Sequence, residues 1–416
     1  MDYAKLADAV ERDAALRRKQ ILQPVGGKND KIFPPTYPKE RRGEGPRRGE
    51  VPRHVFERRR FNGREAWCAL VDSVQSQANR LEEALLGALR EGAIRLPYIT
   101  VDFSEAGLAG IIEITSLEAP HRVYDAILRD SSLNGQPFMK GELGIRLAEA
   151  KPGNATALLE TSPTALLLGA WHSTGEGGGF GAKFPRCLVS EIIAVDVPVD
   201  EGPVDPRTGE IEVRTSSRRT SSRIDPLGVL RRVEVFKGQD GWDVVKDRAG
   251  KGAKPVRPSE INHGNILPTV QPLGVTCDYV EHTAVISFAG LRRLGFGGGE
   301  RDRAGRALLA ALGLVALSEQ DARGYALRSR CDLVCEGYTP FELVHADGNV
   351  DHVEIERGAA RALYAASLDA ARKAGFNIVG EPIRLTPQDK LVEIVRRSQA
   401  LALEGEGGEA EESEDE

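Results

Sequence analysis

The spacing of hydrophobic residues predicts several helices along the chain. Residues 64–91 carry apolar side chains at helical spacing from Trp67 to Leu89, and Gly92 follows them. This pattern predicts one long helix that ends near Gly92. Further helices are expected at residues 2–20, 120–129, 155–168, 303–317, 357–374 and 386–402, and Pro163 should interrupt the third of these.

Other segments alternate apolar and polar residues or are rich in Val and Ile, as strands are. Leu96–Phe103 and Leu108–Thr115 flank a short turn and predict a hairpin. Arg186–Val199 predicts a buried strand. Shorter strands are expected at residues 229–236, 283–288 and 328–334, whereas residues 238–275 are expected to form loops. Strands and helices follow one another irregularly, which favours an α+β fold over a doubly wound sheet.

Residues 200–226 interrupt this pattern because they are polar and almost free of large apolar side chains. Such a segment contributes little to a core, so we expect it to protrude. Arginines alternate there with serines and threonines, which suits contacts with phosphate and ribose but also suits disorder. The arginines are Arg207, Arg214, Arg218, Arg219 and Arg223. One hypothesis is a hairpin that lies across a nucleic-acid strand.

Charge is distributed unevenly along the 416 residues. The net charge is −6, but residues 401–416 hold eight acids and no base, so the remainder carries about +2. Residues 17–64 hold fifteen Lys and Arg against five Asp and Glu. We therefore expect a basic N-terminal helix and extended arm at residues 1–60, a core at 61–400 and a disordered acidic tail at 401–416. The arm is either a polyanion contact or a solvated, poorly ordered segment.

The composition also indicates where the protein works. The sequence has no run of about 18 apolar residues and no basic start followed by an apolar block, so neither a membrane helix nor a secretory signal is expected. The chain has five cysteines, an odd number scattered along it. They indicate a reducing compartment, and we expect the protein in the cytoplasm.

The glycine-rich stretch Gly175–Lys183 resembles a nucleotide-binding loop only superficially. Phe184 stands where a P-loop needs Ser or Thr, and a strand-like segment follows where a Rossmann turn would open a helix. The stretch is better explained as a loop that approaches a phosphate backbone, with Lys183 and Arg186 supplying charge. A plain surface loop is the alternative.

A second basic, glycine-rich stretch runs from Leu291 to Arg301 between a predicted strand and a predicted helix. Helix N-termini attract phosphates, so Arg292 and Arg293 are candidate contacts with a nucleic-acid backbone. The alternative is a solvated loop.

Histidines and cysteines offer weaker candidates for catalysis or metal binding. His121 and Arg122 lie at a predicted helix start, and His172 precedes a serine, but no acid–base partner is evident from the sequence. The spacing of Cys331, Cys335, His345 and His352 does not fit a zinc finger, and both thiols are expected to face the core. No metal and no cofactor are predicted.

Five strings of residues are distinctive when taken together and in order: Ile114–Ser131, Leu159–Leu166, Leu168–Gly175, Gly181–Ile192 and Ser217–Gly228. Together they resemble the CRISPR-associated RAMP protein of subtype I-U, also called I-G, a Cas-seven-type backbone subunit. The resemblance spans about residues 60–400. It implies an RRM-like (ferredoxin-like) core with large insertions and a thumb-like hairpin at about 199–228.

The resemblance also implies a function. Identical subunits would assemble head to tail along a CRISPR RNA, the guide would pair with target DNA, and the other Cascade subunits would be a large subunit and a Cas-five/Cas-six-like subunit. Catalysis is not expected. The expected RNA-binding residues are His121, Arg122, Lys183, Arg186, Arg218, Arg219, Arg223, Arg292 and Arg293. The rival hypotheses are a RAMP-superfamily endoribonuclease that processes CRISPR RNA with His121 or His172, and a nucleotide-binding protein that uses Gly175–Lys183.

Overall fold

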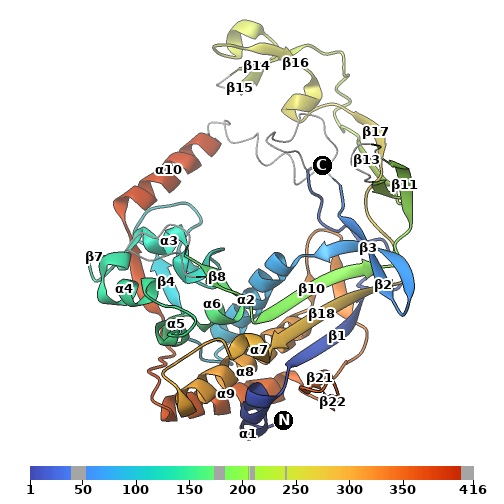
Figure 1. Ribbon diagram of the computed structural model, residues 1–416. Helices are drawn as coiled ribbons and strands as arrows, with labels where there is room; N and C mark the ends of the chain where they lie inside the picture. Colours follow the sequence, from blue (N-terminus) through green and yellow to red (C-terminus); the bar gives the residue numbers. More distant parts are fainter. Residues whose placement is uncertain (39–52, 173–182, 205, 207–210, 239–240, 404–416) are drawn as a thin grey trace.

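The protein is built around one large antiparallel sheet (Figure 1). The computed structural model describes residues 1–38, 53–172, 183–204, 206, 211–238 and 241–403. Nine strands form the main sheet, in the order β19-β20-β1-β18-β10-β3-β2, with β21 also paired to β1 and β22 paired to β21. Their bounds are β1 Ala15–Pro24, β2 Phe56–Phe61, β3 Arg64–Asp72, β10 Leu188–Val195, β18 Tyr279–Ser287, β19 Tyr325–Ala326, β20 Asp332–Cys335, β21 Phe341–Val344 and β22 Val350–Val353.

The N-terminal segment belongs to this sheet rather than to a separate arm. The helix expected over residues 2–20 is wrong beyond α1 (Tyr3–Arg12), because β1 follows and pairs with β18 and β20. Leu16, Arg18 and Leu22 are buried while Arg17 and Lys19 are exposed, which is the alternation of a strand. The expected boundary at residue 60 therefore does not separate residues 1–24 from the core. Residues 39–52 of the basic arm lie outside the described residues.

Two helices cover one face of the main sheet. They are α2 (Val74–Arg90) and the largely buried α8 (Gly299–Arg323), and α9 (Arg357–Lys373) packs on α8. The helix expected over residues 64–91 is two elements, since β3 ends at Asp72 and the side chain of Ser73 caps α2. With other elements inserted between them, β1, α2, β10, β18, α8 and β20 occur along the chain in the order β-α-β-β-α-β, which is compatible with the expected RRM-like core. The α+β prediction is confirmed.

A smaller sheet, on the left in Figure 1, forms a second lobe in the order β5-β4-β23-β6-β7. The predicted hairpin is confirmed as β4 paired antiparallel with β5, although both strands are shorter than expected. The break expected at Pro163 separates α5 from α6. The bounds are β4 Ile99–Asp102, β5 Glu113–Thr115, β6 Ser131–Leu133, β7 Gln136–Pro137, β23 Ile383–Pro387, α3 Ala126–Arg129, α4 Glu142–Ala148, α5 Thr156–Thr161, α6 Pro163–Leu167 and α10 Asp389–Leu403.

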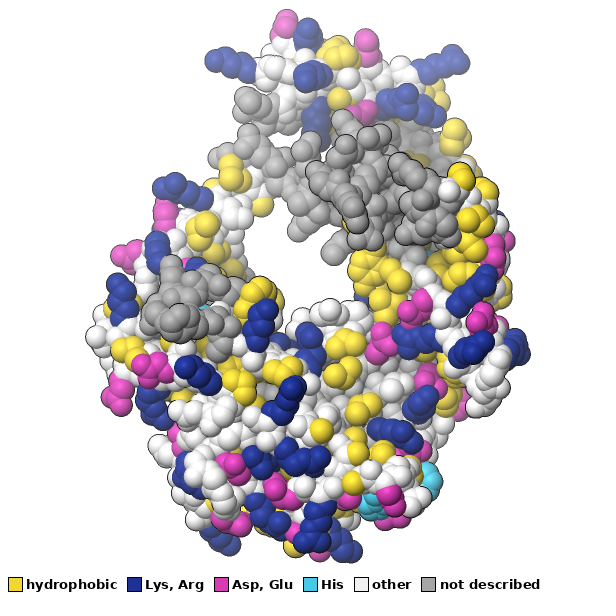
Figure 2. All heavy atoms as spheres, in the orientation of Figure 1, with side chains coloured by type: hydrophobic (Ala, Val, Ile, Leu, Met, Phe, Trp, Pro, Cys, Tyr) yellow, Lys and Arg dark blue, Asp and Glu magenta, His cyan; other side chains and the backbone are white. Residues whose placement is uncertain are grey.

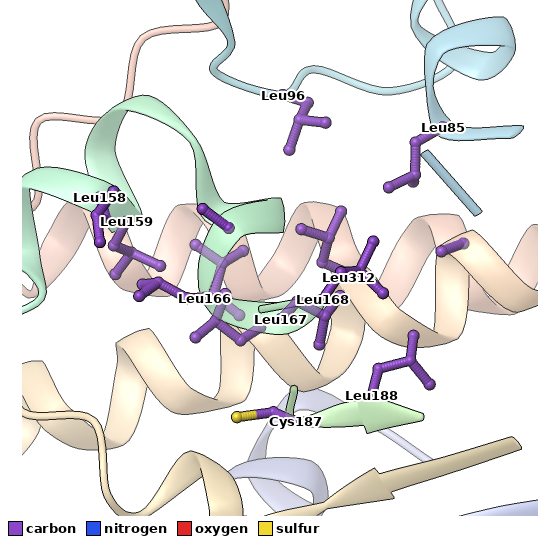
Figure 3. Close-up of a cluster of buried hydrophobic side chains, with 14 of the residues drawn as sticks. Leu85, Leu96, Leu158, Leu159, Leu166, Leu167, Leu168, Cys187, Leu188 and Leu312 are labelled. Carbon is purple, nitrogen blue, oxygen red and sulfur yellow. The ribbon is translucent and has the colours of Figure 1, made fainter. Parts of the chain in front are cut away.

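The two lobes share one hydrophobic core. Leucines of α5 and α6 lie beside α8, and Leu188 of β10 approaches from the main sheet (Figure 3). Most of α8 between Ala304 and Gln320 is shielded from solvent, so α8 is the central helix of this core. Within the described residues, no helix combines the length and the apolar character needed to cross a membrane.

The chain between β10 and β18 forms a long insertion, at the upper right and top of Figure 1. It begins with β11 (Val199–Val204) and β12 (Ile211–Thr215), continues with β13 (Arg219–Arg223) paired with β17 (Ile266–Gln271), and ends in a tip of β14 (Val235–Gly238), β15 (Gly241–Asp243) and β16 (Lys254–Val256). The expected thumb ended near residue 228, but the β13–β17 pair extends the protrusion to Gln271. The strand expected at 229–236 forms only from Val235, and residues 238–275 contain three strands rather than loops alone.

A histidine between two carboxylates ties α1 to the β21–β22 hairpin. His345 Nδ1 lies 2.9 Å from Asp13 and Nε2 lies 3.0 Å from Asp351. These hydrogen bonds raise the pKa of His345 above its ordinary value of 6.5, and the bond to Asp13 contributes most. A raised pKa in the folded state stabilises the protein below pH 6.5, and the contribution is lost as the pH rises through the folded-state pKa.

We therefore expect His345→Asn to lower the melting temperature more at about pH 5.5 than at about pH 8.5. Thermal unfolding of both proteins across this range checks the difference. His352→Asn is the matched control, because His352 is exposed in the same hairpin and forms no ion pair with the described residues. An equal loss at both pH values would contradict the prediction.

Candidate nucleic-acid interface

A short two-stranded hairpin presents an exposed tryptophan beside a lysine. β8 (Ala170–Trp171) pairs with β9 (Lys183–Phe184), so Trp171 lies opposite Lys183. The Trp171 residue is 56% exposed, and the Lys183 ammonium lies 4.6 Å from the centre of its ring. The partner residue on the other face, Phe184, is buried. The hairpin thus places an aromatic face and a cation together at the surface.

The glycine-rich stretch itself joins these two strands. Residues 173–182 lie outside the described residues, so the predicted loop contacts of Gly175–Gly181 have no structural description. Lys183 and Arg186, the two cations predicted at its end, are both exposed. Neither forms an ion pair within the part of the chain that the structure describes.

Arg186 lies in a positive environment. Its side chain packs against Gly169, and burial together with the nearby Arg122 guanidinium lowers the pKa of Arg186. Because no described carboxylate neutralises Arg186, an anion such as a phosphate would relieve this repulsion. The arrangement is suited to hold a phosphate beside Gly169, at the base of the hairpin.

Arg122 is placed differently from the expectation. Its side chain is buried at 5% exposure, lies 2.8 Å from Glu82 of α2, and Nη1 donates a hydrogen bond of 3.1 Å to the carbonyl of Gly169. A guanidinium occupied in this way is not available to RNA in this conformation. Burial raises the pKa of Glu82 to about 7, although Arg122 acts in the opposite direction. Arg122 instead supports the turn at Gly169 that leads into β8.

The two candidate histidines also lie near this hairpin. His172 is buried and stacks on Tyr124, with ring centres 4.9 Å apart and planes inclined by 14°. His121 is exposed and precedes the short helix η1 (Arg122–Tyr124), where its backbone N–H donates to Asp125. Since successive strand residues alternate in direction, the inward His172 fixes the outward direction of Trp171.

The arginines predicted for the thumb divide into two groups. Arg218 pairs with Asp200 at 3.1 Å and donates to the carbonyls of Thr215 and Ser217, and Arg223 donates to the carbonyl of Asn262. These two side chains hold strands of the insertion together. Arg219 forms no ion pair or side-chain hydrogen bond with the described residues. Arg219 is therefore the one of the three that is best placed for a ligand.

The tip of the insertion carries a cationic cluster that we did not predict. Residues 226–275 hold eight Lys and Arg against five Asp and Glu, and none of the eight forms an ion pair within the described residues. Figure 2 shows Lys and Arg side chains around this tip. The eight are Arg231, Arg232, Lys237, Lys246, Arg248, Lys251, Lys254 and Arg257. The signal in the sequence is the excess of Lys and Arg over Asp and Glu in this window, which the hydrophobic pattern does not show.

The second basic stretch also divides. Arg292, at the end of the short helix α7 (Phe288–Leu291), donates to the carbonyls of Val10 and Asp13 at 2.7 and 2.8 Å. Arg292 therefore binds the end of α1 rather than solvent. Arg293 is exposed and forms no ion pair among the described residues. Only Arg293 keeps the position of a surface contact.

A comparison with known protein families gives a match over part of the chain. Residues 16–199 match the family described as CRISPR-associated protein GSU0053. This match indicates a CRISPR-associated protein. The matched residues run from β1 to the start of the insertion and include Trp171, Lys183 and Arg186, whereas the arginines of the insertion lie beyond them. A comparison with curated proteins finds no match.

The open face of the main sheet in this CRISPR-associated protein carries charges that neutralise one another. Lys19 lies 3.4 Å from Glu281, and Arg59 lies 2.7 Å from Glu191. Arg17 pairs with Glu342 of β21 at the same face. Cations that already have carboxylate partners attract phosphate weakly. The hairpin and the insertion are therefore better candidates for the nucleic-acid interface than the sheet.

A buried serine–histidine pair in this CRISPR-associated protein superficially resembles a catalytic dyad. Ser190 Oγ lies 2.6 Å from Nε2 of His282, whose Nδ1 lies 3.1 Å from the hydroxyl of Tyr325. All three residues are shielded from solvent, and burial lowers the pKa of His282 to about 3. A neutral, inaccessible histidine satisfies its neighbours but cannot meet a substrate, so the chain of contacts is structural.

The predicted cysteine and histidine positions do not converge. Cys331 is buried, Cys335 is half-buried, and His345 is held by Asp13 and Asp351. Within the described residues, no three His, Cys, Asp or Glu side chains group so that they could hold a metal ion. The expectation that both thiols face the core is confirmed for Cys331 and holds in part for Cys335.

Proposed function

We propose that this CRISPR-associated protein is a non-catalytic backbone subunit of a type I effector complex of subtype I-U/I-G, which binds CRISPR RNA along its length. The observation that carries the proposal is the set of exposed cations without carboxylate partners, Lys183 and Arg186 at the hairpin and the cluster at the insertion tip. In Figure 1, β8 of the hairpin lies in the lower half of the view, below the tip of the insertion at the top. Phosphates of one RNA strand would bind both.

The chemistry of these cations fits a backbone reader. Lys and Arg contacts to phosphate position a strand but carry no sequence information. In this proposal the guide RNA itself reads the target DNA by base pairing, and the protein holds its backbone and shape. Affinity then depends on salt, because each neutralised phosphate releases counterions.

Exposed apolar residues on the insertion support assembly with further subunits. Ile224, Leu227, Leu230 and Leu267 are large, aliphatic and mostly exposed. Exposed aliphatic side chains of this kind are covered at low cost by a partner protein. We propose that identical subunits stack head to tail through the insertion, and that the other Cascade subunits bind the ends of this assembly. The five free cysteines fit the reducing cytoplasm.

The non-catalytic part of the proposal is supported by the surroundings of the two candidate histidines. His172 is buried against Tyr124, and no described side chain lies within hydrogen-bonding distance of the His121 ring. General acid–base catalysis needs such a partner. Incubation with precursor CRISPR RNA tests this part, and defined cuts that disappear in His121→Ala or His172→Ala would overturn it.

Removal of the two hairpin cations tests RNA binding. We expect Lys183→Ala/Arg186→Ala to weaken binding of single-stranded RNA by about tenfold or more, because two charge-assisted contacts are lost. The slope of log K against log salt should flatten by about 1.4, or about 0.7 for each phosphate contact. Fluorescence anisotropy at several salt concentrations measures both quantities.

Arg60→Ala/Arg64→Ala is the matched control. It removes the same charge from exposed residues that pair with Glu65 and Asp196 at the edge strands β2 and β3. The control should change the affinity and the salt slope little. If both double variants behave alike, the hairpin has no specific role in RNA binding.

A further inference from the structure

We propose that Trp171 is a stacking platform for an unpaired nucleobase of single-stranded RNA, with Lys183 binding the adjoining phosphate. This inference rests on the proposed RNA-binding function and specifies what the hairpin recognises. The ligand is a nucleotide within a single strand, not a base-paired duplex.

The exposure of Trp171 has no explanation in the fold. Trp67 is half-buried, its indole N–H donates to Glu201 at 2.8 Å and Arg58 lies over its ring. Trp171 is more exposed than either Trp67 or Trp242, and its indole N–H has no protein acceptor among the described residues. A tryptophan that stabilises the fold would bury its ring, whereas a ring that binds a ligand stays open.

The ring offers one free face. The Lys183 ammonium covers the other face at 4.6 Å, yet 56% of Trp171 remains exposed. A base can therefore stack on the opposite face while Lys183 fixes the indole in place. In this proposal the ammonium binds the phosphate beside the stacked base, because no described carboxylate competes for it.

The strand beneath the ring is held rigidly. Gly169 has a φ of +86°, and a Cβ there would come within 3.1 Å of the carbonyl oxygen of Phe184. The buried Arg122 donates to the Gly169 carbonyl, and His172 stacks on Tyr124. Arg122 and His172 are therefore positioning residues that aim Trp171 outward. A platform fixed before binding loses little entropy when a base stacks on it.

The chemistry selects an unpaired base. In a duplex each base is stacked on both sides, so neither of its faces is free for an aromatic side chain. In a single strand a base can turn out and stack, which is worth about 1–3 kcal/mol. This range corresponds to roughly 5- to 150-fold in affinity. Lys183 alone would not distinguish the two forms, because both carry phosphates.

Binding of three probes of equal length to the full-length protein tests the proposal. The probes are a single-stranded RNA, the same ribose-phosphate chain without bases, and an RNA duplex of the same sequence. Wild-type protein should prefer the single strand over the abasic chain by roughly 5- to 150-fold. Trp171→Ala should lose most of this preference, and Trp171→Phe should keep part of it.

Two further readouts separate stacking from charge. Trp171→Ala should leave the salt slope unchanged, since no phosphate contact is removed. Ile112→Ala, which removes a 72% exposed apolar side chain outside the hairpin and the insertion, should keep the preference for bases. Urea unfolding of each variant shows whether the fold is intact.

The outcomes distinguish the two proposals. If Trp171→Ala and wild type show the same ratio between single-stranded and abasic probes, the stacking proposal is overturned while RNA binding stands. If wild type binds none of the probes, the RNA-binding function fails and the stacking proposal fails with it. If Trp171→Ala loses the preference for the single-stranded over the abasic probe while its salt slope stays unchanged, both RNA binding and base stacking are supported.

Discussion

Arg122→Ala should destabilise the protein by about 3–5 kcal/mol, because it leaves the carboxylate of Glu82 buried without its counter-charge. Both side chains are almost completely shielded, and they meet at 2.8 Å. The loss of stability should grow as the pH rises above about 7. Without Arg122, Glu82 must then either carry an unpaired buried charge or stay protonated at a pH where the unfolded chain would release the proton. Urea unfolding at about pH 6 and about pH 8 measures the change.

Two variants control this result. Arg90→Ala removes an arginine from the same helix as Glu82, but that arginine is exposed and pairs with Glu118 at 3.4 Å, so a loss of under about 1 kcal/mol is expected. Arg122→Met/Glu82→Met removes both charges and should recover much of the stability. A cost for Arg122→Ala as small as that of Arg90→Ala would show that the pair is not effectively buried.

The same substitution connects the core to the interface. Arg122 donates to the carbonyl of Gly169, the residue that precedes β8. Any weakening of RNA binding in folded Arg122→Ala should therefore reduce the preference for bases, because Trp171 loses its support. The salt slope should stay near the wild-type value, since Arg122 is buried and contacts no phosphate in this conformation.

Leu312→Ala should cost about 2–5 kcal/mol of unfolding free energy. Leu312 lies in the middle of α8 with no exposed surface, beside the leucines of α6 and its end (Figure 3). Truncation removes apolar contacts and leaves a cavity. The neighbouring helices can fill this cavity only in part, because their other contacts hold them in place. Urea or thermal unfolding with fits for the midpoint and slope checks the value.

Ile394→Ala is the control for this prediction. Ile394 is 64% exposed on α10, so its truncation should change the unfolding free energy by no more than about 0.5 kcal/mol. Similar midpoints for Leu312→Ala and Ile394→Ala would contradict the central position of α8 in the core.

The sequence predicted correctly those elements whose hydrophobic pattern or turn residues fit only one type of secondary structure. The α+β class, the hairpin of β4 and β5, the helix break at Pro163 and the strand β10 all follow from spacing and turn residues. Two helices were extended too far, over residues 2–20 and 64–91. In both, apolar residues such as Leu16 and Leu70 fit a helix and a strand equally well over a short stretch, so pairing with a distant strand decided the outcome.

The sequence predicted which charged residues could form the candidate site, but not which of them pair with other residues of the protein. Lys183 and Arg186 could be found because exposed cations near glycines are visible in the sequence. Arg122 carries the same charge, yet its partner Glu82 lies 40 residues away and removes it from the surface. Arg292 likewise binds the end of α1, which is 279 residues away at Asp13.

By itself, the sequence determined the fold class, the uneven charge, the polar protruding segment and the resemblance to a CRISPR-associated family, because these depend on composition and local order. Tertiary structure alone decided which cations remain free, that β1 lies in the centre of the sheet and that Trp171 points outward. The physical reason is that burial and ion pairing depend on residues far apart in the chain. An arginine that pairs with a carboxylate, as Arg122 does, stabilises the fold, whereas an arginine without such a partner, as Arg186 is among the described residues, can bind a ligand.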